Sequence, residues 1–100
     1  MTPTPIYTFA KWKIKAGNLE TVMTMLKELR AKTTGENGNL FYNVHQSVTD
    51  PNTLVLMEGY VSEEAQKEHV NSDHYKKLAA ERIVPLLDER EVTLVTPLEI

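Results

Sequence analysis

The chain has no cysteine, few basic residues and no long apolar run. Without cysteine there can be no disulfide, no thiolate nucleophile and no sulfur-rich zinc site. Eleven Lys and Arg against fourteen Asp and Glu give a formal net charge of −3, whereas proteins that neutralise phosphates need a basic surface. No apolar stretch approaches the roughly 20 residues of a membrane helix. We therefore expect one soluble, cytoplasmic domain over residues 1–100 that binds neither nucleic acid nor membranes.

Glycine and serine are also too sparse to form the common cofactor and nucleophile motifs. The four glycines form no G-x-G-x-x-G or phosphate-binding loop, which argues against nucleotides and Rossmann-type flavins. None of the three serines lies in a nucleophile elbow: these are Ser47, Ser62 and Ser72. The sequence thus predicts no nucleotide or flavin cofactor and gives no support to a serine hydrolase.

Hydrophobic periodicity predicts four strands and three helical segments. The strands are expected at residues 6–15, 39–48, 53–61 and 91–96. The helices are expected at residues 19–33, 63–70 and 75–84, and Pro85 should stop the last of them. The resulting order β-α-β-β-α-α-β is typical of a ferredoxin-like α+β fold with an antiparallel sheet.

The first two helices each have a candidate N-cap. Asn18 precedes the first helix and Ser62 precedes the second, and both residue types cap helices well. In the first helix, apolar residues at helical spacing predict the buried face. That face consists of Leu19, Val22, Met23, Leu26 and Leu29, with Met25 widening it.

The third expected strand is apolar on both of its faces. Leu54 and Leu56 lie on one face, while Val55, Met57 and Val61 lie on the other. Helices in this order cover only one face of a sheet, and a sheet face in water should be polar. We therefore expect a homodimer in which two sheets meet face to face, although strand propensity alone would also favour such residues.

Two of the three histidines lie near the predicted break between the second and third helices. His69 and His74 are five residues apart, so on an unbroken helix they would point ~140° apart. They do not match the i, i+4 spacing of zinc-binding helices, and no metal site is expected. The Asn71–Asp73 break could still turn both side chains toward one cavity. The alternative for His69 is a capped or solvated helical histidine.

An ordered set of residues between Glu36 and Tyr75 resembles a known family. The set is Glu36-Asn37-Gly38-Asn39-Leu40-Phe41-Tyr42, Asp50-Pro51, Glu58-Gly59-Tyr60, Ser62, Glu64-Ala65, His69, Ser72 and His74-Tyr75. It resembles the antibiotic biosynthesis monooxygenase domain family. The resemblance covers nearly the whole chain and implies the dimeric α/β-barrel arrangement of that family. It is less specific for the reaction, because the family also contains quinol oxidases, haem-degrading enzymes and isomerases.

The resemblance implies a cavity between the sheet and the helices. Positions carried over from the family place Tyr42, Glu58, Tyr60, His69 and His74 around it. Trp12 has the parity to join them if Ala10 faces the same side. The alternative is structural: a buried carboxylate and core aromatics that only hold the fold together.

The family's monooxygenases work without metal, flavin or haem, so the resemblance implies no cofactor. An electron-rich phenol or hydroquinone, once deprotonated, can itself donate an electron to oxygen, and the protein supplies a dry pocket and a base. We expect His69 to be that base, because histidine gains and loses a proton near neutral pH. Glu58 is expected to hold its ring or to stabilise its protonated form.

Three functions remain open. The first is a cofactor-independent monooxygenase of a small aromatic or quinol-type substrate. The second is an isomerase of a small hydroxylated or phosphorylated carbonyl compound, and the third is a non-catalytic, dimeric small-molecule-binding domain. Haem degradation is not expected, because the positions that hold Asn, Trp and His in haem-degrading relatives correspond to Ala10, Tyr60 and about Ala79.

The turn between the second and third strands decides whether two tyrosines share the cavity. A three-residue connection, Asp50–Asn52, between paired Thr49 and Thr53 would set Tyr42 opposite Tyr60. A two-residue connection would turn one of the two strands over, because side chains alternate between the faces. We expect the three-residue connection.

Overall fold

The structure is a computed structural model that describes residues 4–100 of the single domain expected over residues 1–100. Its strands are β1 (Ile6–Ile14), β2 (Asn39–Gln46), β3 (Thr53–Tyr60) and β4 (Leu87–Val95). Its helices are α1 (Leu19–Thr34), α2 (Glu63–Val70), the π-helix η1 (Tyr75–Ile83) and the 3₁₀ turn η2 (Val84–Leu86). The predicted ferredoxin-like order is confirmed.

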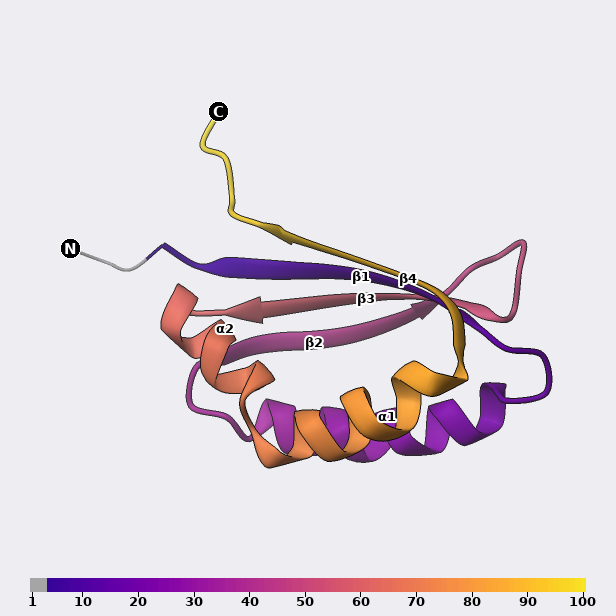
Figure 1. The fold of residues 1–100 in the computed structure, drawn as a ribbon. Helices are drawn as coiled ribbons and strands as arrows, with labels where there is room; N and C mark the ends of the chain where they lie inside the picture. The colour runs from indigo at the N-terminus through magenta and orange to yellow at the C-terminus, as the bar shows by residue number, and fades with distance from the viewer. Residues whose placement is uncertain (1–3) are drawn as a thin grey trace.

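The four strands form one antiparallel sheet in the order β2-β3-β1-β4. Figure 1 shows α1, α2 and η1 on a single face of this sheet. The alternation along β1 explains why: Ala10, Trp12 and Ile14 turn toward the helices and are buried. Between them, Lys11 and Lys13 point to the opposite face and are exposed. The parity predicted for Trp12 and Ala10 is confirmed.

Helix α1 buries most of the predicted face, and Met23 is the exception. Val22, Leu26 and Leu29 lie in the core as expected, and Met25 joins them. Met23 is half exposed, with a relative exposure of 52%, and contributes little to the core. Both residues are methionines, so only their angles around the helix decide which one faces the sheet.

The two predicted helix caps differ in outcome. The Ser62 side chain accepts a hydrogen bond from the Ala65 amide at 3.1 Å, which fixes the start of α2. Asn18 stands at the start of α1, but its side chain makes no capping bond and donates instead to the Lys15 and Ala16 carbonyls. The side chain of Asn18 therefore stabilises the preceding turn rather than the helix.

The β2–β3 register differs from the prediction by two residues. Tyr42 lies opposite Glu58, not opposite Tyr60. The connection is longer than three residues because the Ser47 amide bonds to the Thr53 carbonyl, which places Ser47, not Thr49, beside Thr53. A shift of two residues keeps the parity of each strand. Tyr42 and Tyr60 are therefore both buried on the helix side, as the site requires.

The last third of the chain differs most from the predicted elements. In η1 the bonding widens: the Val84 amide donates to the Ala79 carbonyl, five residues back. Strand β4 begins at Leu87, four residues earlier than expected, so that Arg90 pairs with Trp12.

Within residues 4–100, each helix is too short or too polar to span a lipid bilayer.

Helices do not cover the other face of the sheet (Figure 1), and this face carries an apolar patch. Tyr7 and Phe41 pack edge to face, with ring centroids 5.3 Å apart. Phe9 is 39% exposed, and Val55 and Met57 are only half buried. These five side chains, here called the outer patch, lie on neighbouring residues of β1, β2 and β3.

Candidate functional site

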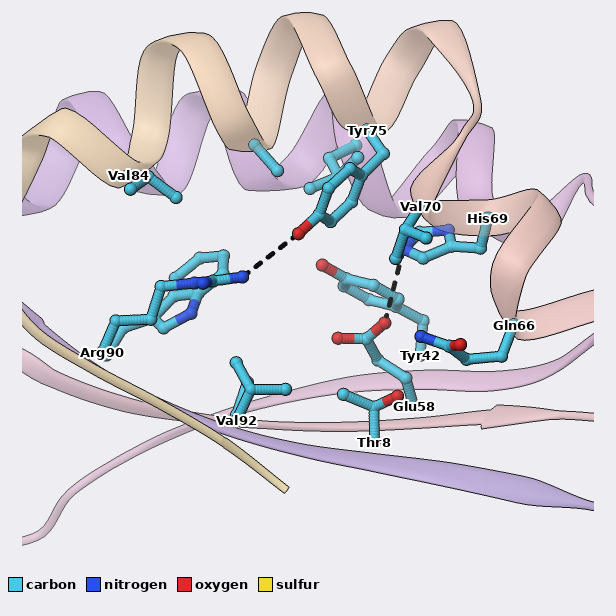
Figure 2. Close-up of a pocket in the computed structure, with 14 residues that line it drawn as sticks. Thr8, Tyr42, Glu58, Gln66, His69, Val70, Tyr75, Val84, Arg90 and Val92 are labelled. Carbon is cyan, nitrogen blue, oxygen red and sulfur yellow. Dashed lines mark hydrogen bonds and ion pairs between the residues drawn. The ribbon is translucent and has the colours of Figure 1, made fainter. Parts of the chain in front are cut away.

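A cavity of about 50 Å³ lies between the helix face of the sheet and the helices α2 and η1. Its lining includes Thr8, Ala10, Trp12, Leu29, Tyr42, Glu58, Gln66, His69, Val70, Tyr75, Ala79, Val84, Arg90 and Val92. The η1 members Tyr75 and Ala79 and the following Val84 are spaced by four and five residues, which the wide turns of a π-helix bring onto one side. Figure 2 shows these side chains converging from the sheet and the helices.

A buried carboxyl group forms the floor of the cavity. Glu58 is 7% exposed, and the Tyr60 hydroxyl donates a hydrogen bond to its Oε1 at 2.6 Å. Burial raises the pKa of the Glu58 carboxyl, while the Tyr60 hydrogen bond and the charge of His69 oppose the rise. Burial and then the charge of Glu58 raise the pKa of Tyr42 and of Tyr60. Both tyrosines are therefore neutral hydroxyl groups at physiological pH.

His69 is held between two carboxyl groups, one at each ring nitrogen. It lies in the last turn of α2 and is 3% exposed. Its Nδ1 is 2.9 Å from Oε2 of Glu36, and its Nε2 is 3.5 Å from Oε1 of Glu58. The hydrogen-bond partner that orients the ring is thus Glu36, whereas Glu58, expected in that role, makes the longer contact.

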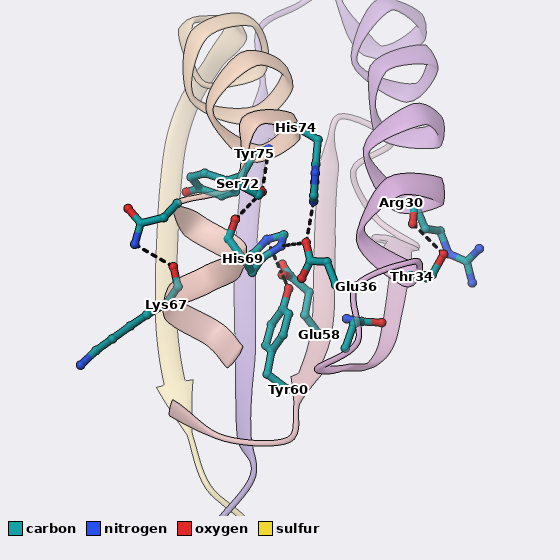
Figure 3. A network of polar contacts seen from close by, with 12 residues as sticks. Arg30, Thr34, Glu36, Glu58, Tyr60, Lys67, His69, Ser72, His74 and Tyr75 are labelled. Carbon is teal, nitrogen blue, oxygen red and sulfur yellow. Dashed lines mark hydrogen bonds and ion pairs between the residues drawn. The ribbon is translucent and has the colours of Figure 1, made fainter. Parts of the chain in front are cut away.

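The break between α2 and η1 brings the second histidine to the same carboxylate. The Ser72 hydroxyl donates to the His69 carbonyl and accepts from the Tyr75 amide, so it closes one helix and opens the next. His74 thereby places its Nε2 2.5 Å from Oε2 of Glu36. Figure 3 shows both rings directed at Glu36. The break thus brings both histidines to one carboxylate, but not to one cavity as the sequence suggested, because His69 lines the cavity and His74 does not.

The predicted site residues therefore fall into two groups. Trp12, Tyr42, Glu58 and His69 line the cavity. Tyr60 and His74 lie behind it, where they bond to Glu58 and Glu36 respectively. Glu36 opens the stretch that carries the family resemblance, but no sequence pattern assigns it a role, because its partners lie 33 and 38 residues away.

Arg90 is a second residue that sequence reasoning missed. It lies outside the strand expected at residues 91–96, so its facing could not be inferred. In the structure it lines the cavity and donates a hydrogen bond to the Tyr75 hydroxyl at 3.1 Å. It is the one arginine or lysine among the lining residues that the structure describes. An anionic group of a ligand would meet this guanidinium.

Two buried polar atoms of the lining residues have no hydrogen-bond partner among residues 4–100. These are Nε1 of Trp12 and Oγ1 of Thr8. A buried donor without a partner costs about 1–3 kcal/mol, and both residues line the cavity. Water or a polar ligand in the cavity would satisfy them.

Comparison with known proteins places the fold and the sequence in one family. The sequence profile described as antibiotic biosynthesis monooxygenase matches residues 5–81. Rv0793 from Mycobacterium tuberculosis is 28% identical, with a TM-score of 0.89, over 97% of this chain and 98% of that one. A conserved protein from Methanosarcina mazei Go1 is also 28% identical, with a TM-score of 0.87, over 92% and 91% of the two chains.

A putative antibiotic biosynthesis monooxygenase from Bacteroides thetaiotaomicron is 26% identical to this chain. Its TM-score is 0.87, and the match covers 96% of this chain and 91% of that one. No curated protein matches the sequence. The similarity therefore establishes the fold and the family, and the reaction has to be argued from the cavity.

Proposed function

Because the chain belongs to the antibiotic biosynthesis monooxygenase family, we propose that it is a cofactor-independent monooxygenase of a small aromatic or hydroquinone-type substrate. The observation that carries this proposal is the placement of His69. Its Nδ1 bonds to a carboxylate, while its other nitrogen turns toward Glu58 and the cavity. A base oriented by a third group is the arrangement that proton abstraction needs.

The first step is transfer of the substrate's hydroxyl proton to Nε2 of His69. With Nδ1–H donating to Glu36 at 2.9 Å, the lone pair of the neutral ring is on Nε2. The Glu36 carboxylate then stabilises the imidazolium that forms. His74 and Tyr60 are positioning residues, since they bond to Glu36 and Glu58 and do not line the cavity.

The resulting phenolate needs donors in a site with little water. The Arg90 guanidinium and the Tyr75 hydroxyl lie on the helix-and-β4 side of the cavity. Nε1 of Trp12 is a further donor without a partner in the described chain. Preorganised donors of this kind stabilise developing negative charge more strongly than water does.

The phenolate then supplies the electrons for oxygen. For a hydroquinone, the reaction joins C₆H₆O₂ and O₂ to give the hydroxyquinone C₆H₄O₃ and H₂O. One oxygen atom forms the new carbon–oxygen bond, and the other leaves as water. The substrate provides all four electrons, so the reaction balances without an external reductant.

The size of the cavity implies a movement when substrate binds. A volume of about 50 Å³ holds a few water molecules but not a phenol ring. Arg90 is exposed and is joined to Tyr75 by a single hydrogen bond of 3.1 Å. We propose that opening this bond enlarges the cavity toward solvent and frees the guanidinium for the substrate anion.

Oxygen consumption with a panel of hydroquinones and naphthols tests the proposal. We expect uptake of one O₂ per substrate and incorporation of one ¹⁸O atom from ¹⁸O₂ into the product. His69→Ala should lower turnover ~100-fold or more with the fold intact, whereas His45→Ala, outside the cavity, should retain it. Ligand binding without oxygen uptake would support the binding-domain alternative instead.

Arg90 favours one further candidate. A base and a guanidinium on one cavity also suit an isomerase that removes a proton beside a carbonyl group while the guanidinium holds a phosphate. Incorporation of deuterium from D₂O into a phosphorylated hydroxyketone, at the carbon beside the carbonyl group and without O₂ uptake, would identify this activity.

We further propose that the protein is a homodimer through the outer patch. Tyr7, Phe9, Phe41, Val55 and Met57 occupy the middle of the uncovered sheet face. At one end of this face Lys11 and Lys13 lie opposite Glu91 and Glu89, giving a polar rim. Self-association about a twofold axis would bury the outer patch of both protomers in one interface. Light scattering should give twice the 11.4 kDa chain mass, and a folded monomer at micromolar concentration would contradict it.

A further inference from the structure

We propose that Glu36, His69 and His74 form a binding site for a divalent first-row transition metal ion such as Zn²⁺. Each residue contributes one ligand atom, and these atoms lie within 4.8 Å of one another. They come from three segments: the loop after α1, the end of α2 and the start of η1. Figure 3 shows the three side chains meeting at one point.

The donor set selects the class of metal. Two imidazole nitrogens and one carboxylate oxygen suit Zn²⁺, Ni²⁺, Cu²⁺ or Fe²⁺, whereas Mg²⁺ and Ca²⁺ prefer oxygen ligands alone. Bonds of about 2.0–2.2 Å at tetrahedral angles place ligand atoms roughly 3.4 Å apart. The two nitrogens are now 2.9 and 2.5 Å from Oε2 of Glu36. The carboxylate therefore has to withdraw by less than about 1 Å. The two nitrogens, which lie within 4.8 Å of each other, have to approach by up to about 1.4 Å.

The surroundings of His69 match what a metal-bound imidazole requires. A histidine that ligates a metal through one nitrogen usually donates its other N–H to a carboxylate. Nε2 of His69 lies 3.5 Å from Oε1 of Glu58, and the Tyr60 hydroxyl bonds to that same oxygen atom at 2.6 Å. Glu58 is buried, so this second carboxyl group is fixed in place. This support is independent of the three ligands themselves.

A groove gives an ion a path from solvent to Glu36, one of the three proposed ligands. It has a volume of about 370 Å³ and is lined by residues that include Gly35, Glu36, Glu68 and Ser72. The side chains of Glu36 and His74 are 18% and 17% exposed, whereas that of His69 is 4% exposed. The partly exposed side leaves room for water as further ligands, and the negative charge of Glu68 at the groove attracts cations.

Metal binding would change the state of the cavity base. With the ion on Nδ1, the proton of the neutral His69 ring resides on Nε2, where it faces Glu58 and the cavity. The ring is then a donor and cannot accept the substrate's proton. The ion would thus act as an inhibitor of the proposed oxygenation, but its binding does not depend on that function.

Titration of metal-free protein with Zn²⁺, followed by calorimetry, tests the site without any substrate. We expect one Zn²⁺ per chain, with a rise in the thermal midpoint. His74→Asn and Glu36→Gln should each weaken binding by ~100-fold or more, given that loss of even an outer partner costs 10–100-fold. His45→Asn is the matched control, because His45 is exposed and lies outside the cluster.

Substoichiometric binding, or unchanged binding in both ligand variants, would overturn the proposal and would show that the three residues are only a hydrogen-bonded clamp. If the ligand variants do not fold, the visible spectrum of the wild-type protein with Co²⁺ decides. Visible ligand-field bands that differ from those of aqueous Co²⁺ would support the site, and a spectrum unchanged from that of aqueous Co²⁺ would refute it. Failure of the oxygen-uptake screen bears on neither result.

Discussion

The close approach of Gly59 and Phe41 offers a sharp test of the proposed dimer. The two residues are cross-strand partners, and the Phe41 ring lies over the glycine. A Cβ atom added at Gly59 would be 2.2 Å from Cε2 of Phe41, whereas ordinary contact begins at 3.4 Å. Gly59→Ala must therefore displace the ring by more than about 1 Å and disturb its packing against Tyr7.

The expected effect on self-association follows from this displacement. The Tyr7–Phe41 pair lies within each protomer, so the change in self-association comes from the contact of the displaced ring with the partner's patch. An aromatic contact of this kind is worth about 0.5–1.5 kcal/mol beyond its buried area, and a twofold interface contains it twice. The loss of about 1–3 kcal/mol corresponds to a dimer dissociation constant raised roughly 5- to 150-fold. Sedimentation equilibrium over a range of concentrations measures it, with circular dichroism to establish that the variant is folded.

Gly35→Ala is the matched control for this measurement. A Cβ at Gly35 would meet its nearest atom, the Lys32 carbonyl oxygen, at 3.4 Å, and the residue is exposed at the end of α1. It should leave dimerisation unchanged. If Gly59→Ala does not fold, Met57→Lys places two like charges in the proposed interface instead. A dissociation constant unchanged in a folded Gly59→Ala or Met57→Lys protein would refute the outer patch as the interface.

Three further changes probe the site and its supports. Tyr60→Phe removes the 2.6 Å bond to buried Glu58 and should lower the free energy of unfolding by about 1–3 kcal/mol in urea; no loss would mean that the bond is not formed in solution. Ser62→Ala should cost about 1 kcal/mol by removing the cap of α2, seen first as faster amide exchange in that helix. The Thr53 and then the Asn52 hydrogen bonds hold the pKa of Asp50 below its usual value, so its contribution to stability is complete above about pH 4 and is lost as the pH falls through the lowered pKa. Asp50→Asn should therefore weaken the β2–β3 hairpin at pH 7 and have less effect near pH 2, and an equal effect at both pH values would contradict this.

Local patterns predicted the parts of the fold that depend on local residues. Alternation along β1 identified Trp12 and Ala10 as inward-facing, and the Ser62 cap located the start of α2. The register of β2 against β3 was missed by two residues, because a turn sequence does not fix how many flanking residues join the loop. Since parity survived the error, Tyr42 and Tyr60 could still be placed on the correct face.

The candidate site was only partly predictable, for a different reason. Glu36 lies in a loop, and its contacts with His69 and His74 arise only when α2 and η1 pack beside that loop. Arg90 reaches the cavity because β4 begins earlier than its β-branched residues indicate. The widened turns of η1 have no signal in a pattern read at α-helical spacing. Long-range packing decides all three, so composition and periodicity could not reveal them.

The position of His69 between two carboxyl groups links the proposed chemistry and the proposed metal site. Glu36 is partly exposed on a loop and faces Nδ1, whereas Glu58 is buried on the sheet and faces Nε2. A neutral imidazole has one proton, which either nitrogen can carry but not both. When Nδ1 carries the proton and donates a hydrogen bond to Glu36, Nε2 is a base for the cavity. When a metal ion occupies Nδ1, the proton lies on Nε2, which then faces Glu58 as a donor. Metal binding at Nδ1 and proton abstraction by Nε2 therefore exclude each other. Whether an ion occupies Nδ1 determines whether Nε2 can accept the substrate's proton.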